Sequence, residues 1–462
     1  MTIAPPRIGV LGLLLDAYKP LFPGIQEEQE EFVRRLLAEH VGIADFVFPG
    51  AAIDRASIEH IVAGFHVDGV DGILILMLSY APGQHVLRAA LDSPLPFALA
   101  LVQPDETVRT DVDERGLTVN QGIHGAQDVV NTLLRGGVRP ALFAGRRSDG
   151  ALAAFLADFA AACAATADAH RMRIGAVGAL TGMGDIVTDE MVLLRRLGPQ
   201  VVHQPVGEIQ RRVAAVGDDA VRARVADDRA RFDIDPALSE DAHAYAVRLY
   251  LGIARWLEDN DFAGYTAHYE DFGADGRFRQ LPLLAASHLM ADGYGYAAEG
   301  DVQAATLVTV FQRLFSAAGF TEMYMLDHER DAVLCAHAGE ANWRLAEGRP
   351  RIIHRVLTEG GLGDPPTTVF APRAERAVLA SLVHVGGDEY RLVSASGRIL
   401  EQVALPGCDM PYFFFQPDSG AARMARDWMS AGGAHHQALA LGDTGARLEL
   451  WCSMNGIEHV RV

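Results

Sequence analysis

The sequence predicts an α/β protein in which two doubly wound, parallel-sheet domains are followed by a β-rich C-terminal domain. In the first third of the chain, continuous apolar runs alternate with amphipathic stretches, and the alternation starts again near Arg171. After Phe320, short strand-like segments follow one another instead. Apolar strands that alternate with helices indicate a parallel sheet covered by helices on both faces. We therefore expect three domains, at residues 1–168, 169–318 and 319–462.

The first domain is expected to contain five buried strands, RIGVLGLLL, ADFVFP, GILILML, PFALALV and PALFAG. Amphipathic segments between them predict helices at 26–38, 54–65 and 124–134. Ligands of such sheets bind outside the carboxyl ends of the strands. The candidate ligand loops are therefore 16–24, 78–83 and 120–124.

In the second domain, RIGAVGAL and QVVHQPV are expected to be strands, with helices at 209–225 and 239–260. The Gly-rich loop Thr181–Asp185 follows the first of these strands. It lacks the full GxGxxG pattern and the later acidic residue, so dinucleotide binding is not favoured. The Asp- and Arg-dense stretch 218–235 is expected to be a solvated helix face and connector.

The third domain is expected to consist of short strands and one helix. The strand-like segments are EMYMLD, AVLCAH, RIIHRVL, TTVFAP, AVLASLVHV, EYRLVSAS, RILEQVAL and YFFFQP. Gly386–Asp388 and Ser396–Gly397 have the composition of hairpin turns. A helix is expected at 421–429.

Composition and net charge exclude some classes of binding partner and indicate the compartment of the protein. The 462 residues carry a net charge of −20, which argues against nucleic acid or an anionic membrane surface as a partner. Four scattered cysteines with no CxxC pair are typical of a reduced, cytoplasmic protein. The first apolar run has no basic segment before it and reads as a strand, not a signal peptide. No apolar run is expected to approach the length that spans a bilayer.

The stretch 288–301, HLMADGYGYAAEGD, is the centre of the functional hypothesis. It is interpreted as the end of a helix at 283–291, a Gly-punctuated turn, and a new helix that starts near Glu299 and continues over 302–318. This would place the Glu299 carboxylate in the first turn of a long apolar helix. The alternative is that Glu299 and Asp301 only cap that helix.

Further along the chain, Glu322, His337 and the pair His435–His436 supply the other residue types that a metal site needs. Two carboxylates with one or two imidazoles suit Mn²⁺ or Mg²⁺, and Co²⁺ less specifically, and leave positions open for substrate oxygens. A structural zinc site would be richer in cysteine. The alternative is that these are ordinary hydrogen-bonded strand residues and a polar corner.

Several of these segments together resemble the arabinose/fucose isomerase superfamily, and the resemblance runs over most of the chain. ADGYGYAAEGD is similar to the GYGFxxEGDxxxA signature of the L-arabinose isomerases. Further similar segments are Gln280-Leu-Pro, NQGIHG at 120–125, QPDSGAARMARDW, AGGAHH at 431–436, and the Met183 loop with Val187-Thr-Asp189.

The resemblance implies a divalent cation, usually Mn²⁺, held by Glu299, Glu322, His337 and His436, with Glu299 and Glu322 also catalytic. Glu322 is chosen because Phe320-Thr-Glu-Met-Tyr matches the family pattern FxExY. A competing alignment frame leaves Asp327 near the ligand position instead.

The resemblance also implies a cytoplasmic aldose–ketose isomerase that works through a cis-enediolate or a hydride shift. The implied substrate-binding residues are Gln121, His124, Met183, Tyr269 and His435. In the family the NQxxHG segment reaches the site of a neighbouring subunit within a trimer, and trimers pair into hexamers. Two alternatives stay open: a non-catalytic sugar-binding module, and a metal-dependent epimerase or lyase.

The chain also departs from the family. LGLLLDAYKPLFPG follows the first strand where the family has a Gln-containing segment, and an insertion at 274–278 follows Tyr269. We therefore expect a sugar other than L-arabinose, a hexose or one modified at C6, including a sulfonated one. Lys19, Arg146 and Arg147 are candidate cations for an anionic group, or ordinary surface charges.

Overall fold

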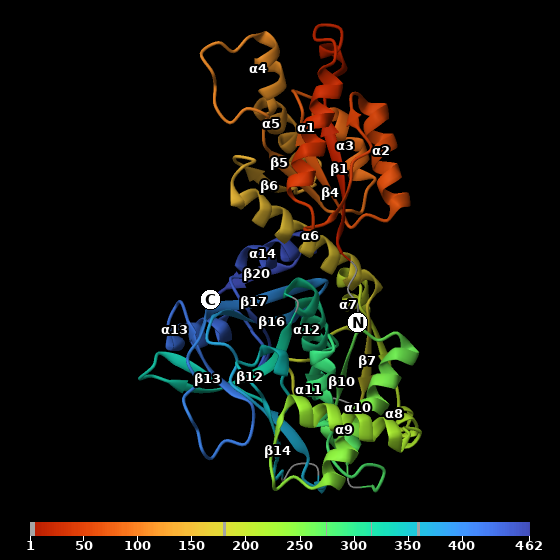
Figure 1. Ribbon diagram of the computed structural model, residues 1–462, viewed down its shortest axis with the longest axis vertical. Coiled ribbons are helices and arrows are strands. Elements are labelled where there is room, and N and C mark those ends of the chain that lie inside the picture. The colour runs from red at the N-terminus through yellow and green to blue at the C-terminus, as the bar shows by residue number, and fades with distance from the viewer. Residues whose placement is uncertain (1–4, 179–181, 274, 316, 358–360) are drawn as a thin grey trace. The chain divides into compact units, whose positions relative to one another are not determined.

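The computed structural model describes residues 5–178, 182–273, 275–315, 317–357 and 361–462 (Figure 1). The chain divides into two compact units, residues 2–167 and residues 168–462. Both contain a parallel sheet with helices, and the C-terminal part of the second is rich in strands. The predicted fold class is therefore confirmed. The division of the second unit at 318/319 stays a prediction.

The unit of residues 2–167 is a parallel α/β fold in which β1 is flanked by β2 and β4. Its strands are β1 Arg7–Leu13, β2 Asp45–Val47, β3 Ala51–Ala52, β4 Gly72–Met77, β5 Phe97–Leu101 and β6 Ala141–Ala144. They run in the order β2-β1-β4-β5-β6, with β3 also paired to β1. Its helices are α1 Ile25–Glu39, α2 Arg55–Asp68, α3 Gln84–Leu91, α4 Glu114–Asn120, α5 Gly122–Arg135 and α6 Gly150–Arg171, which runs on into the second unit.

Two expectations for this unit are wrong. The expected loop 120–124 is almost entirely helical, because Asn120 ends α4 and Gly122 starts α5, with only Gln121 between them. Helix α6 is long and apolar enough to cross a membrane by length and composition, although no such run was expected. Half of its most apolar window is buried inside the protein, which is the condition of a core helix. Its apolarity comes mostly from alanine, which forms no conspicuous apolar run in the sequence.

The second unit begins with a four-stranded parallel sheet in the order β11-β10-β7-β8. Its strands are β7 Arg173–Val177, β8 Gln200–His203, β10 Gly264–Ala267 and β11 Gly295–Ala298. Its helices are α7 Glu190–Leu197, α8 Gly207–Ala214, α9 Asp218–Arg231, α10 Glu240–Asn260, α11 Leu283–Ala291 and α12 Val302–Phe315, with a 3-10 turn η2 Tyr269–Phe272. The single helix expected at 209–225 is therefore two helices.

The strands after α12 form a barrel-like sheet in the order β16-β19-β12-β13-β18-β17-β20, which closes because β16 also pairs with β17. Its strands are β12 Ala318–Asp327, β13 Ala332–Ala336, β16 Arg376–Gly386, β17 Glu389–Ile399, β18 Tyr412–Pro417, β19 His436–Leu441 and β20 Glu458–Arg461. A small sheet joins β9 Asp233–Ile234, β14 Arg351–His354 and β15 Pro366–Val369. The helices are α13 Ala421–Ser430 and α14 Gly445–Met454, with a 3-10 turn η3 Trp343–Leu345.

The two turn predictions in this region have opposite outcomes. The hairpin turn expected at Gly386–Asp388 is confirmed, since it joins β16 to β17. The turn expected at Ser396–Gly397 is wrong, because both residues lie inside β17 and pair with β16. A Cβ on Gly397 would lie 2.3 Å from the Gln416 carbonyl oxygen. This glycine therefore permits the close approach of β18, and it does not mark a turn.

Helix α12 is the element that connects the parallel sheet to the barrel. It packs against β10 and β11 on one side and against β12, β16 and β19 on the other (Figure 1). Every residue from Val302 to Phe311 is buried. A helix that is apolar all round is expected to be buried in this way.

The Asp- and Arg-dense stretch 218–235 is not only a solvated face, because Asp228 is completely buried. Its carboxylate lies 3.1 Å from Arg224 Nε, 3.0 Å from His243 Nε2 and 3.4 Å from His288 Nε2. The Trp343 indole donates to His288 Nδ1 at 3.2 Å. One acidic side chain therefore ties α9 to α10 and α11. Its burial depends on two helices distant in sequence, which composition does not reveal.

We predict that Asp228→Ala lowers the free energy of unfolding by about 3–5 kcal/mol, because it leaves buried cationic and polar partners without their acceptor. Urea denaturation followed by tryptophan fluorescence measures this. Asp227→Ala is the matched control: Asp227 is partly exposed and pairs with Arg231 at 3.1 Å, so its loss should cost less than about 1 kcal/mol. Equal effects of the two substitutions would contradict the prediction.

The same network makes stability depend on pH. Burial lowers the pKa of His288. Burial by itself would raise the pKa of Asp228, but its contacts with His243 and His288 bring that pKa well below its usual range. Both shifts make the unfolded chain bind protons more readily than the folded one. The urea midpoint should therefore fall on acidification, first below about pH 6.5 for His288 and again below about pH 4 for Asp228.

Candidate metal centre

The register of three neighbouring strands brings the candidate ligands of the barrel together. Strand β12 lies between β19 and β13, and Glu322 on β12 is paired with His436 on one side and with Ala336 on the other. His337 follows Ala336 directly. Side chains of directly opposite residues on neighbouring strands point to the same face of the sheet. Main-chain pairing therefore places His436 on the same face as Glu322, and His337 comes directly after the β13 residue that is paired with Glu322.

Glu299 reaches the same place from the parallel sheet. Strand β11 ends at Ala298, and Glu299 follows it with φ 64°, in the left-handed region that is costly for a residue with a side chain. Its backbone N–H donates to the Ala267 carbonyl at 3.0 Å, which holds the turn. The helix expected to start near Glu299 starts at Val302 instead, and Asp301 accepts from Ala304 N at its first turn.

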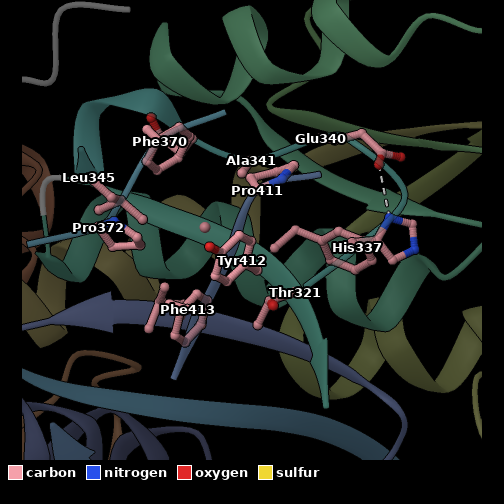
Figure 2. Close-up of a pocket in the computed structure, with 14 residues that line it drawn as sticks. Thr321, His337, Glu340, Ala341, Leu345, Phe370, Pro372, Pro411, Tyr412 and Phe413 are labelled. Carbon is pink, nitrogen blue, oxygen red and sulfur yellow. Dashed lines mark hydrogen bonds and ion pairs between the residues drawn. The ribbon is translucent and has the colours of Figure 1, made fainter. Parts of the chain in front are cut away.

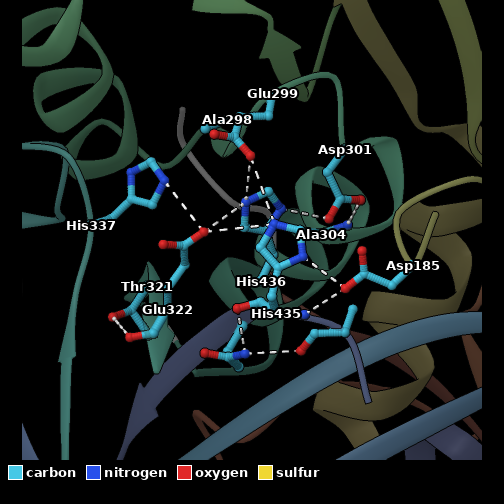
Figure 3. A network of polar contacts seen from close by, with 12 residues as sticks. Asp185, Ala298, Glu299, Asp301, Ala304, Thr321, Glu322, His337, His435 and His436 are labelled. Atoms are coloured by element: carbon cyan, nitrogen blue, oxygen red, sulfur yellow. Dashed lines mark hydrogen bonds and ion pairs between the residues drawn. The ribbon is translucent and has the colours of Figure 1, made fainter. Parts of the chain in front are cut away.

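The four side chains Glu299, Glu322, His435 and His436 each offer a ligand atom within 4.8 Å of the others (Figure 3). His436 Nε2 lies 3.2 Å from Glu322 Oε1 and 3.5 Å from Glu299 Oε2. His337 Nε2 lies 3.8 Å from the same Glu322 oxygen. The structure thus brings together three of the four residues predicted as ligands, Glu299, Glu322 and His436, with His435 as the fourth member of the group. His337 lies beside it and faces Glu322.

Two further carboxylates fix the orientation of the imidazoles. Asp301 Oδ2 accepts from His436 Nδ1 at 2.9 Å, and Glu340 Oε2 accepts from His337 Nδ1 at 2.9 Å. The Tyr296 hydroxyl donates to the other Glu340 oxygen at 2.7 Å. With Nδ1 occupied, each imidazole presents Nε2 toward Glu322. Ligating histidines in metal sites are commonly held in this way.

A small pocket lies beside the His337–Glu340 pair. Figure 2 shows this pair at one end of a pocket whose other walls include Phe370, Tyr412 and Phe413. The pocket holds about 20 Å³, room for about one water molecule. Phe320 packs edge-on against both imidazoles, with ring centroids 4.8 Å from His337 and 4.9 Å from His436. The imidazoles therefore have little freedom to turn away from Glu322.

The electrostatics of the cluster favour a cation. Contacts with His435 and His436 hold the pKa of Glu299 well below its usual range. Burial alone would lower the pKa of His436, but Asp301, Glu299 and Glu322 raise it well above its usual value. For His337, Glu340 likewise outweighs burial and raises the pKa. Several anionic oxygens around buried imidazoles thus stabilise positive charge at this position.

The residues present fit a divalent cation. His436 Nε2 is buried and makes no hydrogen bond with the described residues, although two carboxylate oxygens lie within 3.5 Å. A buried imidazole nitrogen that faces carboxylate oxygens without a hydrogen bond is in the position expected of a metal-ligating atom. Two carboxylates with two or three imidazoles form an oxygen–nitrogen donor set that suits Mn²⁺ and related ions.

His435, expected to bind substrate, lies at the edge of the cluster. Its Nε2 is 3.7 Å from both Glu299 and Glu322, and its Nδ1 is 2.7 Å from Asp185 Oδ2. Asp185 also accepts from the His435 backbone N–H at 2.9 Å. Met183, half-buried, lies two residues before Asp185 in the same loop. The start of this loop, Thr181, and the end of the segment RIGAVGAL lie outside the described residues.

Asp327, the competing ligand of the other alignment frame, lies at the far end of β12. Its carboxylate accepts from Glu329 N at 3.1 Å and from Arg330 N at 3.0 Å, and it pairs with the Arg330 guanidinium at 2.7 Å. These contacts close the turn between β12 and β13. The Asp327 carboxylate thus makes its contacts within the turn between β12 and β13. Glu322, and not Asp327, is the acidic residue of β12 that lies in the cluster.

The other predicted residues are distributed between the two units. Tyr269 begins η2 and lines a cavity that also contains Glu299 and Glu322. Gln121 lies between α4 and α5, and the exposed His124 stacks on Tyr80 with centroids 5.1 Å apart, both in the unit of residues 2–167.

The three candidate cations for an anionic substrate group also lie in that unit. Lys19 is 3.7 Å from Asp16, and Arg147 is 3.0 Å from Glu39. Arg146 contributes to the lowered pKa of Glu106, whose largest cause is the hydrogen bond with Ser148. Each cation therefore has an acidic neighbour within its own unit.

Sequence reasoning missed Asp185, Glu340 and Tyr296, which contact the predicted imidazoles directly or through one partner. The spacing His337-x-x-Glu340 could have suggested one of these contacts. Asp185 lies in the Gly-rich loop that stands out in the sequence, but its contact with His435 had no signal, because 250 residues separate the two.

Comparison with known proteins identifies the family. Residues 171–317 match the L-arabinose isomerase central domain, and residues 317–458 match the L-arabinose isomerase C-terminal domain. L-arabinose isomerase of Clostridium beijerinckii is 28% identical over 424 residues, which cover 90% of this chain and 86% of that protein. L-arabinose isomerase of Acidothermus cellulolyticus is 28% identical over 409 residues, covering 86% and 81%. These matches confirm the predicted resemblance, and the chain belongs to the arabinose isomerase-like family of sugar isomerases.

Proposed function

We propose that this sugar aldose–ketose isomerase depends on a divalent cation, with Mn²⁺ as the expected ion and Mg²⁺ or Co²⁺ as alternatives. The observation that carries the proposal is the convergence of Glu299, Glu322 and His436 around an imidazole nitrogen without a hydrogen-bond partner among the described residues. His337, whose Nε2 faces Glu322 at 3.8 Å, completes the ligand set. His435 stands beside it, within reach of a sugar hydroxyl.

A cation held by Glu299, Glu322, His337 and His436 would supply electrostatic stabilisation of the negative charge that develops on the sugar during the reaction. The chain's own carboxylates move the proton. One of Glu299 and Glu322 removes the proton from C2 of the aldose and leaves a cis-enediolate. The other, in its protonated form, donates a proton to C1 while the O2 hydroxyl proton moves to O1, and proton exchange with solvent then restores both carboxyl groups. The lowered pKa of Glu299, caused by His435 and His436, keeps that carboxylate ionised at neutral pH.

Two other functions use the same residues. A sugar-binding module would need no cation, so metal content separates it from the isomerase. An epimerase or lyase could pass through the same enediolate, and analysis of the product would identify it. Membership of a family of sugar isomerases supports the isomerase over both.

For the substrate, the relatives are named for L-arabinose, and the chain departs from the family in the segment 11–24. This departure supports a sugar other than L-arabinose, a hexose or one modified at C6. A sulfonated sugar would need a cation in the site. Each of the three candidate cations has an acidic neighbour, which supports an unsulfonated one.

The proposal includes a cytoplasmic location and a homo-oligomer, a trimer or hexamer with shared sites. Four free cysteines, three of them buried, support a reducing compartment. The proposal of an oligomer rests on the resemblance of residues 120–125 to a family segment that reaches a neighbouring subunit. Rings of head-to-tail contacts commonly produce such sites.

The metal hypothesis predicts that Glu322→Gln and His436→Ala each abolish turnover and weaken Mn²⁺ binding by more than about 100-fold. Loss of a residue that only hydrogen-bonds to a metal ligand lowers metal affinity by about 10- to 100-fold, so loss of a ligand itself should lower it more. Calorimetric titration of the metal-free protein with Mn²⁺ measures affinity, and Mn²⁺ should raise the Tm of the wild type but not that of these two variants. Asp327→Asn is the matched control and should bind normally. Loss of binding in Asp327→Asn with normal binding in Glu322→Gln would overturn the ligand assignment.

The enediolate route predicts that aldose recovered after partial reaction in D₂O carries deuterium at C2, because the carboxylate that holds the proton exchanges with solvent. Mass spectrometry and proton NMR of the recovered sugar measure it. A control without the metal-loaded enzyme gives the background exchange. Complete retention of a C2 label in the product would indicate a hydride shift instead.

The shared site predicts complementation between inactive chains. His124→Ala and Glu299→Gln, each inactive alone, should regain part of the activity when they are co-assembled, because some interfaces then combine two intact halves. Mixed oligomers are purified with two different affinity tags and assayed against each parent. Verified mixed oligomers without activity would show that each site is built within one chain.

A further inference from the structure

Asp185 reaches the candidate site from the loop that precedes α7, and it is neither a predicted metal ligand nor a predicted substrate-binding residue. Its Oδ2 accepts two hydrogen bonds from one residue, from His435 N at 2.9 Å and from His435 Nδ1 at 2.7 Å. His435 Nε2 lies 3.7 Å from Glu299 Oε2 and 3.7 Å from Glu322 Oε1. The His435 ring therefore lies between Asp185 on one side and two carboxylates of the cluster on the other (Figure 3).

The main chain at His435 is also held by groups of the barrel. The Gln437 side chain donates to the His435 carbonyl at 2.6 Å and to the Ala434 carbonyl at 3.0 Å. The Trp428 indole donates to the same Ala434 carbonyl at 3.1 Å. Loss of the Asp185 side chain would therefore leave the backbone of this turn in place.

The His435 ring has less support than its backbone. Its side chain is 38% exposed, against 0% for the neighbouring His436, so packing does not enclose it. The Cβ–Cγ torsion of a histidine is broad, and a half-exposed ring can turn about it unless a hydrogen bond fixes one nitrogen. The bond from Nδ1 to Asp185 therefore decides that Nε2 is the nitrogen that faces the cluster.

The segment that carries Asp185 is itself anchored. Ile186, the next residue, is buried. Thr188 Oγ1 lies 2.7 Å from the hydroxyl oxygen of Tyr390 on β17, within hydrogen-bond distance. Asp189 caps the first turn of α7. The Asp185 carboxylate is thus presented to His435 by a segment that is fixed both to the barrel and to a helix.

We propose that Asp185 is a positioning residue of the isomerase, which holds the His435 ring so that Nε2, and not Nδ1, meets a sugar hydroxyl at the cluster. The proposal rests on the proposed isomerase function and deepens it, because it assigns a task at the site to a loop of the parallel-sheet layer. Asp185 acts through His435 and needs no contact with the sugar. The alternative is that this contact only joins the loop to the barrel.

Removal of the acceptor should weaken sugar recognition and spare the metal site. In Asp185→Ala, kcat/KM for L-arabinose and D-galactose with Mn²⁺ should fall about 10-fold, the effect of one half-exposed hydrogen bond to a charged partner. L-arabitol and galactitol, the reduced forms of these sugars, cannot isomerise. Their affinity, measured by calorimetric titration of the Mn²⁺-loaded protein, should fall by the same factor. The Mn²⁺ affinity of the metal-free protein should not change.

Asp185→Asn and Asp185→Leu form a matched pair of nearly equal size. An amide oxygen has two lone pairs and can accept both hydrogen bonds from His435, whereas a leucine accepts neither. Asp185→Asn should therefore keep kcat/KM and polyol affinity within about threefold of the wild type, since a neutral acceptor forms only a weaker bond. Asp185→Leu should lose as much as Asp185→Ala.

Asp189→Ala is the control for a merely structural role. It removes the cap of α7 in the same segment and leaves the contact between Asp185 and His435 in place. This substitution should lower the Tm, because a lost cap destabilises its helix. Its kcat/KM and polyol affinity should stay at the wild-type values.

A double-mutant cycle with His435→Ala decides whether Asp185 acts through that ring. Once the ring is absent, Asp185→Ala should cause no further loss of polyol affinity or kcat/KM. The polyol titration gives this comparison even where His435→Ala abolishes turnover. An equal loss in both backgrounds would overturn the inference, and so would wild-type values in Asp185→Leu or a loss in Asp185→Asn as large as that in Asp185→Leu.

The wild type separates failure of the inference from failure of the proposed function. If the Mn²⁺-loaded wild type neither isomerises L-arabinose or D-galactose nor binds either polyol, the proposed function fails together with the inference. A wild type that isomerises a sugar, with an unchanged Asp185→Leu variant, would leave the isomerase intact and remove only the role of Asp185.

Discussion

The pairing of β12 with β19 is the constraint on which the candidate metal centre depends. Glu322 and His436 are direct cross-strand partners, so hydrogen bonds between main-chain groups set the separation of two candidate ligands. A shift of one residue in this register would turn Glu322 to the other face of the sheet. The closed barrel resists such a shift, because β12 is also paired with β13 and β19 with β16. The geometry of the site is thus enforced by the whole barrel.

The buried carboxylates around the cluster have complementary roles. Asp301 and Glu340 each occupy one imidazole nitrogen, and Glu299 and Glu322 face the other nitrogen of His436. This arrangement concentrates negative charge around neutral or cationic groups in a partly buried environment, where the interaction is stronger than in water. The proposed divalent cation would find oxygen and nitrogen donors in this set, and its binding would be coupled to stability through the same contacts.

Glu299 connects the two layers of the second unit. It stands at the carboxyl end of β11, in a left-handed conformation, directly before α12. The carboxyl ends of parallel strands are where α/β sheets place their ligands. Helix α12 packs on both the parallel sheet and the barrel. The turn therefore places the Glu299 carboxylate of the parallel sheet beside the histidines of the barrel. The hydrogen bond from Glu299 N to the Ala267 carbonyl stabilises the left-handed backbone conformation of this turn.

The sequence by itself determined the α/β class, most of the strands and helices, the family, and the residues now found around Glu322. Periodicity and motif spacing are local properties of a chain, and these features depend on them. Only the tertiary structure decided that Asp228 is buried, that Ser396–Gly397 continues a strand and that Glu299 precedes its helix. Each of these depends on which distant segment packs against the residue, and long-range packing leaves no periodic trace in the chain.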